Sequence, residues 1–334
     1  MKIRLVFARY LSCFCALAAL LFGGVLEAAV STTRMLDRVV ATVNSEAISE
    51  SELNRQLDLL TVRLKESDVP LPPIPVLRKQ LLEKMVLEKL QLQMAKAVGI
   101  TIDDKTLSET IKGIADQDNL SVSQLQGFLE GQGVPFKKFK ESINNDLTIS
   151  RLQQREILAH LNVSEMDIEH FMKSGAGQDK SGTEYRLSHI LIPFTENKEA
   201  MAAETEAKNV IARLNKGDNF GQIAVEKSKG SQALNGGDLG FRRISDLPTL
   251  FVTIAPTLKV GEIHGPIKTE NGFHIIKLVE KRNQDENGKI LSPETRREQA
   301  REAILRRKFE EAVASWLRRI RDEAQIEMYL AEAD

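Results

Sequence analysis

Cysteine is almost absent from this chain of 334 residues. The two that occur, Cys13 and Cys15, lie within an apolar run near the N-terminus, and none follows them. From residue 16 onward the sequence therefore offers no disulfide, no thiol nucleophile and no cysteine-ligated metal site. Chemistry in the rest of the chain has to use other side chains.

Three further classes of function lack their usual signatures. No His-Glu-x-x-His motif occurs, so we expect no metal site. The pair Gly236-Gly237 is not followed by the Lys-Ser/Thr of a phosphate loop, which argues against nucleotide binding. A net charge of −1 gives no case for nucleic acid or an anionic membrane as partner. We therefore expect no cofactor of any kind.

The longest apolar run lies at the N-terminus. Three basic residues precede residues 10–26, and the small residues Ala28 and Ala29 follow. This order is typical of a secretory signal peptide, which we predict over 1–29. The run is slightly short for a membrane span, so a retained inner-membrane anchor is the alternative.

Helical spacing dominates residues 50–172. A short strand over 37–44 and a turn over 44–47 precede it, and Ser49 with Glu52 predicts a capped helix start at Glu50. Prolines between 70 and 75 predict an extended connector. The predicted helices cover 50–65, 76–98, 103–116, 121–130, 136–161 and 164–172. Their apolar faces predict one helical domain over 35–174, followed by a polar linker over 175–183.

Residues 185–282 begin and end with strand patterns, with helices and a Gly-rich turn between them. Alternation places His189 on one face of the first strand with Tyr185 and Leu187, and His274 with Ile276 on the last strand. A lone histidine at such a position is usually a hydrogen-bonded core residue. Two of them, on strands that flank a Gly-Gly turn, favour a shared site.

A long amphipathic helix is predicted from Pro293 to about residue 322. Its apolar side carries seven residues: Ala303, Ile304, Phe309, Val313, Trp316, Leu317 and Ile320. Arginines alternate with glutamates elsewhere on this helix, which predicts a solvated face. Because the apolar side needs a partner, we expect the helix to pack on another part of the chain.

Three motifs over about a hundred residues, in register, resemble the parvulin-type peptidyl-prolyl isomerases. They are Ser188-His189-Ile190-Leu191, Gly236-Gly237-Asp238-Leu239-Gly240 and Gly272-Phe273-His274-Ile275-Ile276. The resemblance implies a parvulin-like α+β domain over 184–283 with a small antiparallel sheet.

The first half resembles the N-terminal domain of the SurA family, periplasmic chaperones of outer-membrane proteins. The similar segments are 37–44, 48–53 and 92–100. The resemblance implies that segment 284–334 folds back to complete the helical domain, and that residues 326–328 pair with the strand at Val39. The parvulin-like domain is most similar to the first of the two parvulin domains of SurA, and the second is missing from this sequence.

Prolyl cis-trans exchange has a barrier near 20 kcal/mol, because the amide bond has partial double-bond character. A catalyst needs an apolar pocket for the proline ring and hydrogen-bond groups that favour the twisted amide. The resemblance implies that His189, Thr269 and His274 form the polar network. It places the apolar cup at three residues: Leu239, Leu247 and Phe251.

Two positions depart from the parvulin pattern. Gly230 stands where the family usually carries Cys or Asp, and Asn271 stands where Ser is common. We count both positions with the catalytic set. Because Gly230 removes an acidic or thiol group beside the histidines, we expect weak isomerase activity.

The resemblance implies a periplasmic chaperone that binds unfolded outer-membrane proteins or other exported polypeptides, with a link to the outer-membrane assembly machinery. The class of enzyme implied is peptidyl-prolyl cis-trans isomerase. The alternatives are an efficient periplasmic isomerase and, if the signal is not cleaved, an inner-membrane-anchored foldase.

Overall fold

The computed structural model describes residues 37–67, 69–174, 183–194, 197–283 and 293–330. The predicted signal peptide over 1–29 lies outside these residues, as does the predicted linker except for Thr183. Among the described helices, none has the length and apolar character needed to cross a bilayer.

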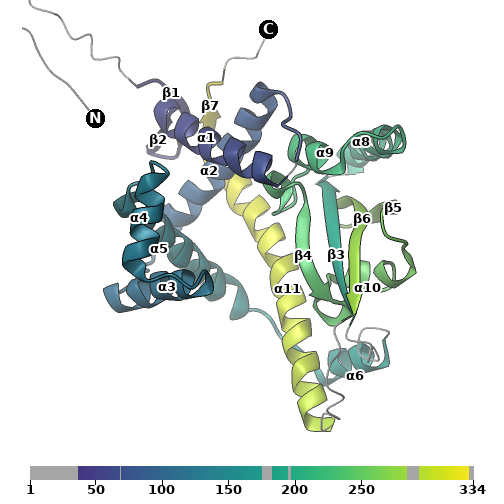
Figure 1. Ribbon diagram of the computed structural model, residues 1–334. Helices are drawn as coiled ribbons and strands as arrows, with labels where there is room; N and C mark the ends of the chain where they lie inside the picture. The colour runs from purple at the N-terminus through teal and green to yellow at the C-terminus, as the bar shows by residue number, and fades with distance from the viewer. Residues whose placement is uncertain (1–36, 68, 175–182, 195–196, 284–292, 331–334) are drawn as a thin grey trace, which may run out of the picture. The chain divides into compact units, whose positions relative to one another are not determined.

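The N-terminal part of the described chain is mainly helical, as predicted (Figure 1). Ser49 caps the first helix, since its side chain accepts a hydrogen bond from the Glu52 amide at 3.3 Å. The helices are α1 (Glu50–Glu66), α2 (Ile74–Ala97), α3 (Asp104–Gln117), α4 (Val122–Gly131), α5 (Phe136–Gln153) and α6 (Glu165–Lys173).

Two local predictions in this part were wrong. The turn expected over 44–47 covers only residues 44–45. A second strand, β2 (Glu46–Ser49), follows it and pairs with β1 (Val39–Val43) before the first helix. The helix expected over 136–161 ends its regular part at Gln153 and continues as one π-type turn over Gln154–Leu158.

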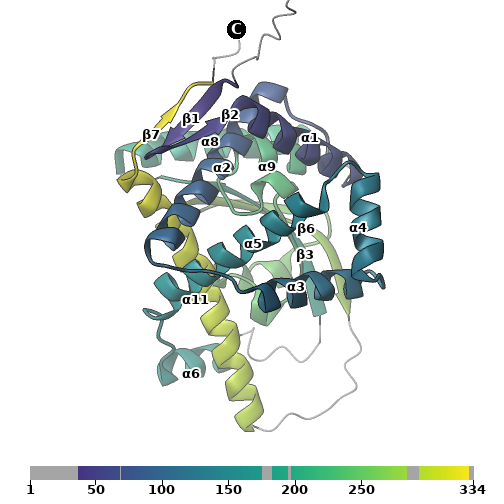
Figure 2. The ribbon, with the colours of Figure 1, turned by 90° about the vertical axis from the view of Figure 1, so that its left-hand side faces the viewer.

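The two ends of the described chain share a sheet. The C-terminal strand β7 (Ile326–Met328) pairs antiparallel with β1, so that Val43 faces Ile326 and Ala41 faces Met328. The sheet order is β2-β1-β7 (Figure 2). This pairing confirms the fold-back expected for the C-terminal segment.

The parvulin-like part contains a four-stranded sheet of order β4-β3-β6-β5, and all of its neighbouring strands are antiparallel. Its strands are β3 (Thr183–Ile192), β4 (Asp238–Arg243), β5 (Ile263–Thr269) and β6 (Gly272–Asn283). Its helices are α8 (Asn197–Asn215), α9 (Phe220–Lys227) and α10 (Thr249–Val252). The α+β class and the small antiparallel sheet are therefore confirmed.

This sheet is covered on both faces. One face, with Leu187 and Ile276, packs against Leu247 and Phe251. The other face, with Ile190 and Ile275, packs against the apolar side chains of α8 and α9. The two imidazoles belong to the first face, as the alternation of the sequence predicted.

The long helix α11 (Pro293–Glu323) contributes to two cores. Near its end, Trp316 and Ile320 are each 5% exposed and join the core built by α1 and α2. Near its start, Ala303 and Ile304 join the core beneath the parvulin-like sheet. The helical domain is therefore completed by the C-terminal helix.

Two further features of α6 and α11 differ from the sequence analysis. Ile168 of α6, expected in the helical domain, is buried in the cluster that contains the parvulin-like sheet. The charged face of α11 was expected to be solvated. Instead, Arg242 pairs with Glu310 at 2.8 Å, and Lys308 pairs with Asp167 at 2.9 Å.

Candidate functional site

Two histidine side chains meet on one face of the parvulin-like sheet. His189 lies on β3 and His274 on the neighbouring strand β6, offset by two residues in register. Their ring planes are within 12° of parallel, with centroids 5.0 Å apart. His189 Nε2 lies 2.9 Å from His274 Nδ1, so the two rings share a hydrogen bond.

The turn between β5 and β6 extends this polar network. Thr269 Oγ1 lies 2.8 Å from His274 Nε2 and also donates to the Gly272 carbonyl at 3.2 Å. The Asn271 amide donates to the same hydroxyl at 3.1 Å. Because the Thr269 hydroxyl donates to the Gly272 carbonyl, it accepts from His274 Nε2–H. His274 Nδ1 then accepts from His189 Nε2–H. His189 Nδ1 is then an acceptor.

Burial keeps both imidazoles neutral at pH 7. Desolvation, with a smaller contribution from His274, lowers the pKa of His189 from 6.5 to about 3. Desolvation, together with the nearby positive charge of Arg318, lowers the pKa of His274 to about 4. The pair can therefore orient a polar group through neutral N–H and N atoms, but it does not carry charge at pH 7.

Gly230 lies beside the outer edge of the pair. A Cβ at this position would be 3.6 Å from His189 Nδ1 and 3.3 Å from Ser228 Oγ. Ser228 Oγ already accepts the amides of Leu191 at 3.0 Å and Gly230 at 3.1 Å. A side chain at position 230 would thus point at the imidazole, as the family resemblance implied.

The Gly-rich turn lies directly against the backbone of His189. The His189 amide donates to the Gly237 carbonyl at 2.9 Å, and a Cβ on Gly237 would lie 2.5 Å from the His189 carbonyl oxygen. The φ of Gly237 is +78°, in the region that favours glycine. Glycine is therefore required here for the close approach that holds His189.

The three residues predicted for the apolar cup share one cluster. Phe251 contacts the imidazoles, with its ring centroid 5.2 Å from that of His189 and 6.4 Å from that of His274. Leu247 is 0% exposed and Leu239 is partly buried. The structure thus places Phe251 against the two imidazoles, with Leu239 and Leu247 in the same apolar cluster as Phe251.

Sequence reasoning missed one residue at this site. Arg318 of α11 donates from Nη1 to the Asn271 carbonyl at 3.1 Å and from Nη2 to Asn271 Oδ1. Nothing in the sequence distinguishes Arg318 from the other arginines of the helix. Among the described residues, no group of three His, Cys, Asp or Glu side chains is placed to hold a metal ion.

Two family descriptions match this chain. Residues 36–153 match the SurA N-terminal domain, and residues 189–280 match the PPIC-type PPIase domain. The chain is therefore SurA-like, and by family its second matched segment is a parvulin-type peptidyl-prolyl cis-trans isomerase domain.

The curated relatives are named for the same class of protein. The chain is 38% identical over 274 residues to Chaperone SurA of Nitrosococcus oceani, covering 81% of this chain and 63% of that protein. It is 37% identical over 267 residues to Chaperone SurA of Legionella pneumophila (strain Paris), covering 79% and 62%. The chain thus spans less than two thirds of the length of these relatives.

Among solved structures, the chain is similar to a crystal structure of a PpiC-type peptidyl-prolyl cis-trans isomerase domain. The identity is 31% and the TM-score 0.29, and the match covers 31% of this chain and 94% of that one.

Proposed function

We propose that this chain is a periplasmic chaperone that binds unfolded outer-membrane proteins and carries an isomerase domain of weak activity. The observation that carries the proposal is the presence of a SurA N-terminal domain and a PPIC-type domain in one chain, aligned with proteins named Chaperone SurA over 81% of its length. The proposal retains the predicted signal peptide over 1–29 and the predicted domains over 35–174 and 184–283, with the end of the first, around Ile168, packed in the apolar cluster of the second.

Exposed apolar side chains on the helical part support the binding of unfolded polypeptides. Leu59 and Val62 of α1 are 51% and 55% exposed. They are three residues apart and therefore lie on one side of the helix. Apolar groups in this position can contact the apolar segments of a client chain, and burial of such groups contributes roughly 25 cal/mol per Å².

The neutral imidazole pair and its apolar surroundings support the isomerase role. We propose that Leu239, Leu247 and Phe251 form the apolar side of the proline site, with Leu239 the most exposed of the three, and that His189, Thr269 and His274 supply the hydrogen bonds. Asn271 orders the turn, and Gly230 leaves the outer edge of His189 without a carboxylate. This last feature favours weak activity over the efficient isomerase of the alternative hypothesis.

The test measures both activities on the chain without residues 1–29. Light scattering follows the aggregation of an unfolded outer-membrane β-barrel protein diluted from urea. We expect the chain to suppress aggregation and Leu59→Glu to lose at least half of that effect. Met201→Glu, which makes the same change from an apolar to an acidic side chain at a 77% exposed position of α8, is the matched control. Equal suppression by Leu59→Glu would exclude this surface as the client site, and no suppression by the unmodified chain would refute the chaperone proposal.

His189→Ala separates the two activities. It should retain the suppression of aggregation and slow the isomerisation of an Xaa-Pro peptide about tenfold, equivalent to about 1.4 kcal/mol of transition-state stabilisation. An unchanged rate in the protease-coupled assay would remove the imidazole pair from the catalytic machinery.

A further inference from the structure

The side chain of Arg318 joins helix α11 to the β5–β6 turn. The guanidinium of Arg318 donates to both the backbone oxygen and the side-chain oxygen of Asn271. Two parallel donors on one planar group fix direction as well as distance. Asn271 is therefore held in place by a residue outside the sheet.

Asn271 is connected to the imidazole pair by a short chain of hydrogen bonds. Its amide donates to Thr269 Oγ1 at 3.1 Å, and that hydroxyl lies 2.8 Å from His274 Nε2. The turn also lies close to β3, since a Cβ on Gly272, whose φ is +143°, would collide with the Ile192 carbonyl. The turn is thus confined between β3 on one side and Arg318 on the other.

The position of Arg318 is set by the helical core. Trp316 and Ile320 lie two residues before and after it on α11, and both are buried in the core formed by α1 and α2. Their burial fixes the rotation of α11 about its axis. That rotation aims Arg318 at Asn271, while the neighbouring Arg319 is exposed.

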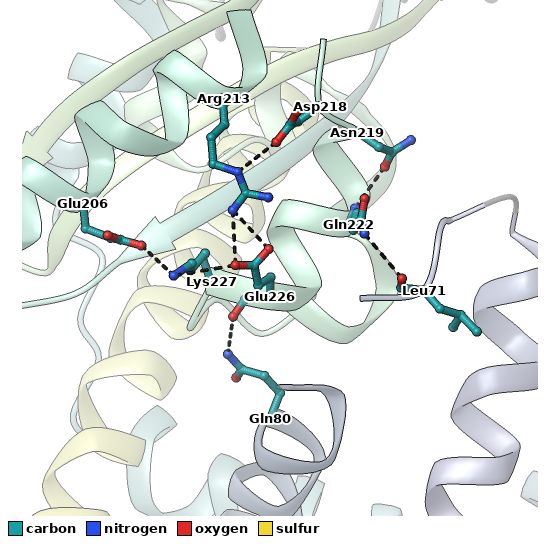
Figure 3. Close-up of polar contacts among 9 residues, drawn as sticks. All are labelled: Leu71, Gln80, Glu206, Arg213, Asp218, Asn219, Gln222, Glu226 and Lys227. Atoms are coloured by element: carbon teal, nitrogen blue, oxygen red, sulfur yellow. Dashed lines mark hydrogen bonds and ion pairs between the residues drawn. The ribbon is translucent and has the colours of Figure 1, made fainter. Parts of the chain in front are cut away.

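The other side of the imidazole pair is held by the same core. Val225, which is fully buried, and Leu234 pack in the helical core, and they flank the loop that contains Gly230. Gln80 of α2 donates to the Glu226 carbonyl at 2.9 Å, as Figure 3 shows. Lys229 pairs with Glu83 of α2. Both loops around the histidines therefore contact residues of the helical core.

We propose that Arg318 is a positioning residue of the isomerase site, which fixes the Thr269–Gly272 turn and thereby the His274 ring from the helical core. This inference rests on the proposed isomerase function of the site. Arg318 acts through Asn271 and Thr269 and does not itself contact the imidazoles by a hydrogen bond. Loss of the two Arg318 hydrogen bonds removes the contact with α11 and leaves the turn held by its own hydrogen bonds and by β3. The hydrogen-bond geometry at His274 Nε2 then changes.

The test compares Arg318→Gln with Arg319→Gln, which removes the same charge one residue further along α11. Two readouts are used on the chain without residues 1–29: the imidazole ¹⁵N signals of His274, and kcat and KM for an Xaa-Pro peptide. We expect Arg318→Gln to shift the His274 signals and to lower kcat roughly tenfold, within the hundredfold that a 1 Å misplacement can cost. KM should change less than twofold, and Arg319→Gln should match the unmodified chain in both readouts.

Two further variants make the outcome decisive. Arg318→Lys keeps the charge but lacks the planar fork, so it should recover less than half of the lost kcat. Asn271→Ala removes one acceptor of the fork and should shift the His274 signals in the same direction. If circular dichroism shows that Arg318→Gln does not fold, the His274 signals of Asn271→Ala test the positioning role instead.

Three results would overturn or redirect the inference. Unchanged His274 signals in both Arg318→Gln and Asn271→Ala would refute the positioning role. Full recovery of kcat by Arg318→Lys would refute the positioning role, because it would show that the positive charge alone accounts for the effect. If the unmodified chain turned over no Xaa-Pro peptide, the proposed isomerase function would fail, while the His274 signals would still decide the role of Arg318.

Discussion

Replacement of Gly230 by aspartate should raise the isomerase activity of this chain. The Cβ at this position faces His189 Nδ1 at 3.6 Å, so a carboxylate there is within reach of that nitrogen. It would accept a hydrogen bond from Nδ1–H and so fix the proton on that atom. The bonds of the network would then run in the other direction, with His274 Nδ1–H donating to His189 Nε2 and Thr269 donating to His274 Nε2.

The expected magnitude follows from the strength of one hydrogen bond to a charged group, about 1.5–3 kcal/mol. At 1.36 kcal/mol per pKa unit, this bond raises the pKa of His189 by about one to two units from its value of about 3. The ring therefore stays neutral at pH 7, and the change is one of orientation and proton position. If half of the bond energy is expressed in the transition state, kcat/KM rises about threefold to tenfold.

The assay is protease-coupled isomerisation of an Xaa-Pro peptide at pH 7. Gly230→Asn has nearly the same size without the charge, and Gly230→Ala reports the steric cost of the 3.3 Å approach to Ser228 Oγ. We expect the Asp variant to exceed both controls. A rate no higher than that of Gly230→Asn, with ¹⁵N signals that place the proton on His189 Nδ1, would show that the proton position does not limit turnover.

Two predictions concern stability. The folded-state pKa values of His189 and His274, about 3 and about 4, lie below the ordinary 6.5, so the unfolded chain binds protons first as the pH falls. The free energy of unfolding should therefore be lowest in acid, falling from pH 6.5 to pH 4.5 by on the order of 2 kcal/mol per imidazole. Denaturant titrations of the unmodified chain and of a double His→Phe variant measure the difference, and equal slopes against pH would contradict it. Trp316→Ala should cost about 3–5 kcal/mol, because the side chain is 5% exposed in the helical core. Met201→Ala, at a 77% exposed position, should change the free energy of unfolding by less than 0.5 kcal/mol in the same guanidinium titration. Similar losses in both variants would contradict the assignment of Trp316 to the core.

Features that depend on neighbouring residues could be predicted from the sequence. The start of α1 was predicted because Ser49 reaches an amide only three residues away. The faces of β3 and β6 were predicted because alternation is a property of each strand alone. By contrast, β2 was not predicted, because it is only four residues long and directly precedes a strong helix start. A segment this short shows too little alternation to indicate a strand.

Features that depend on the rotation or pairing of distant elements needed the structure or the family resemblance. Arg318 and Arg319 are equivalent in the sequence, and only the burial of Trp316 and Ile320 decides which one faces Asn271. The π-type turn at 154–158 has no signature that separates it from α-helix. The pairing of β7 with β1 came from the resemblance, since no local pattern links residues so far apart.

That pairing has a consequence for how the chain acquires its structure. Arg38 donates to the carbonyl of Tyr329, 291 positions away, and bringing ends this distant together costs about 5 kcal/mol in loop entropy. Neither core is complete before α11 exists, since Ala303 and Ile304 belong to one and Trp316 and Ile320 to the other. Neither domain can therefore close before the residues of α11 have been synthesised. A chain truncated before α11 would leave the apolar sides of α1 and α2 uncovered and would itself become a substrate for chaperones.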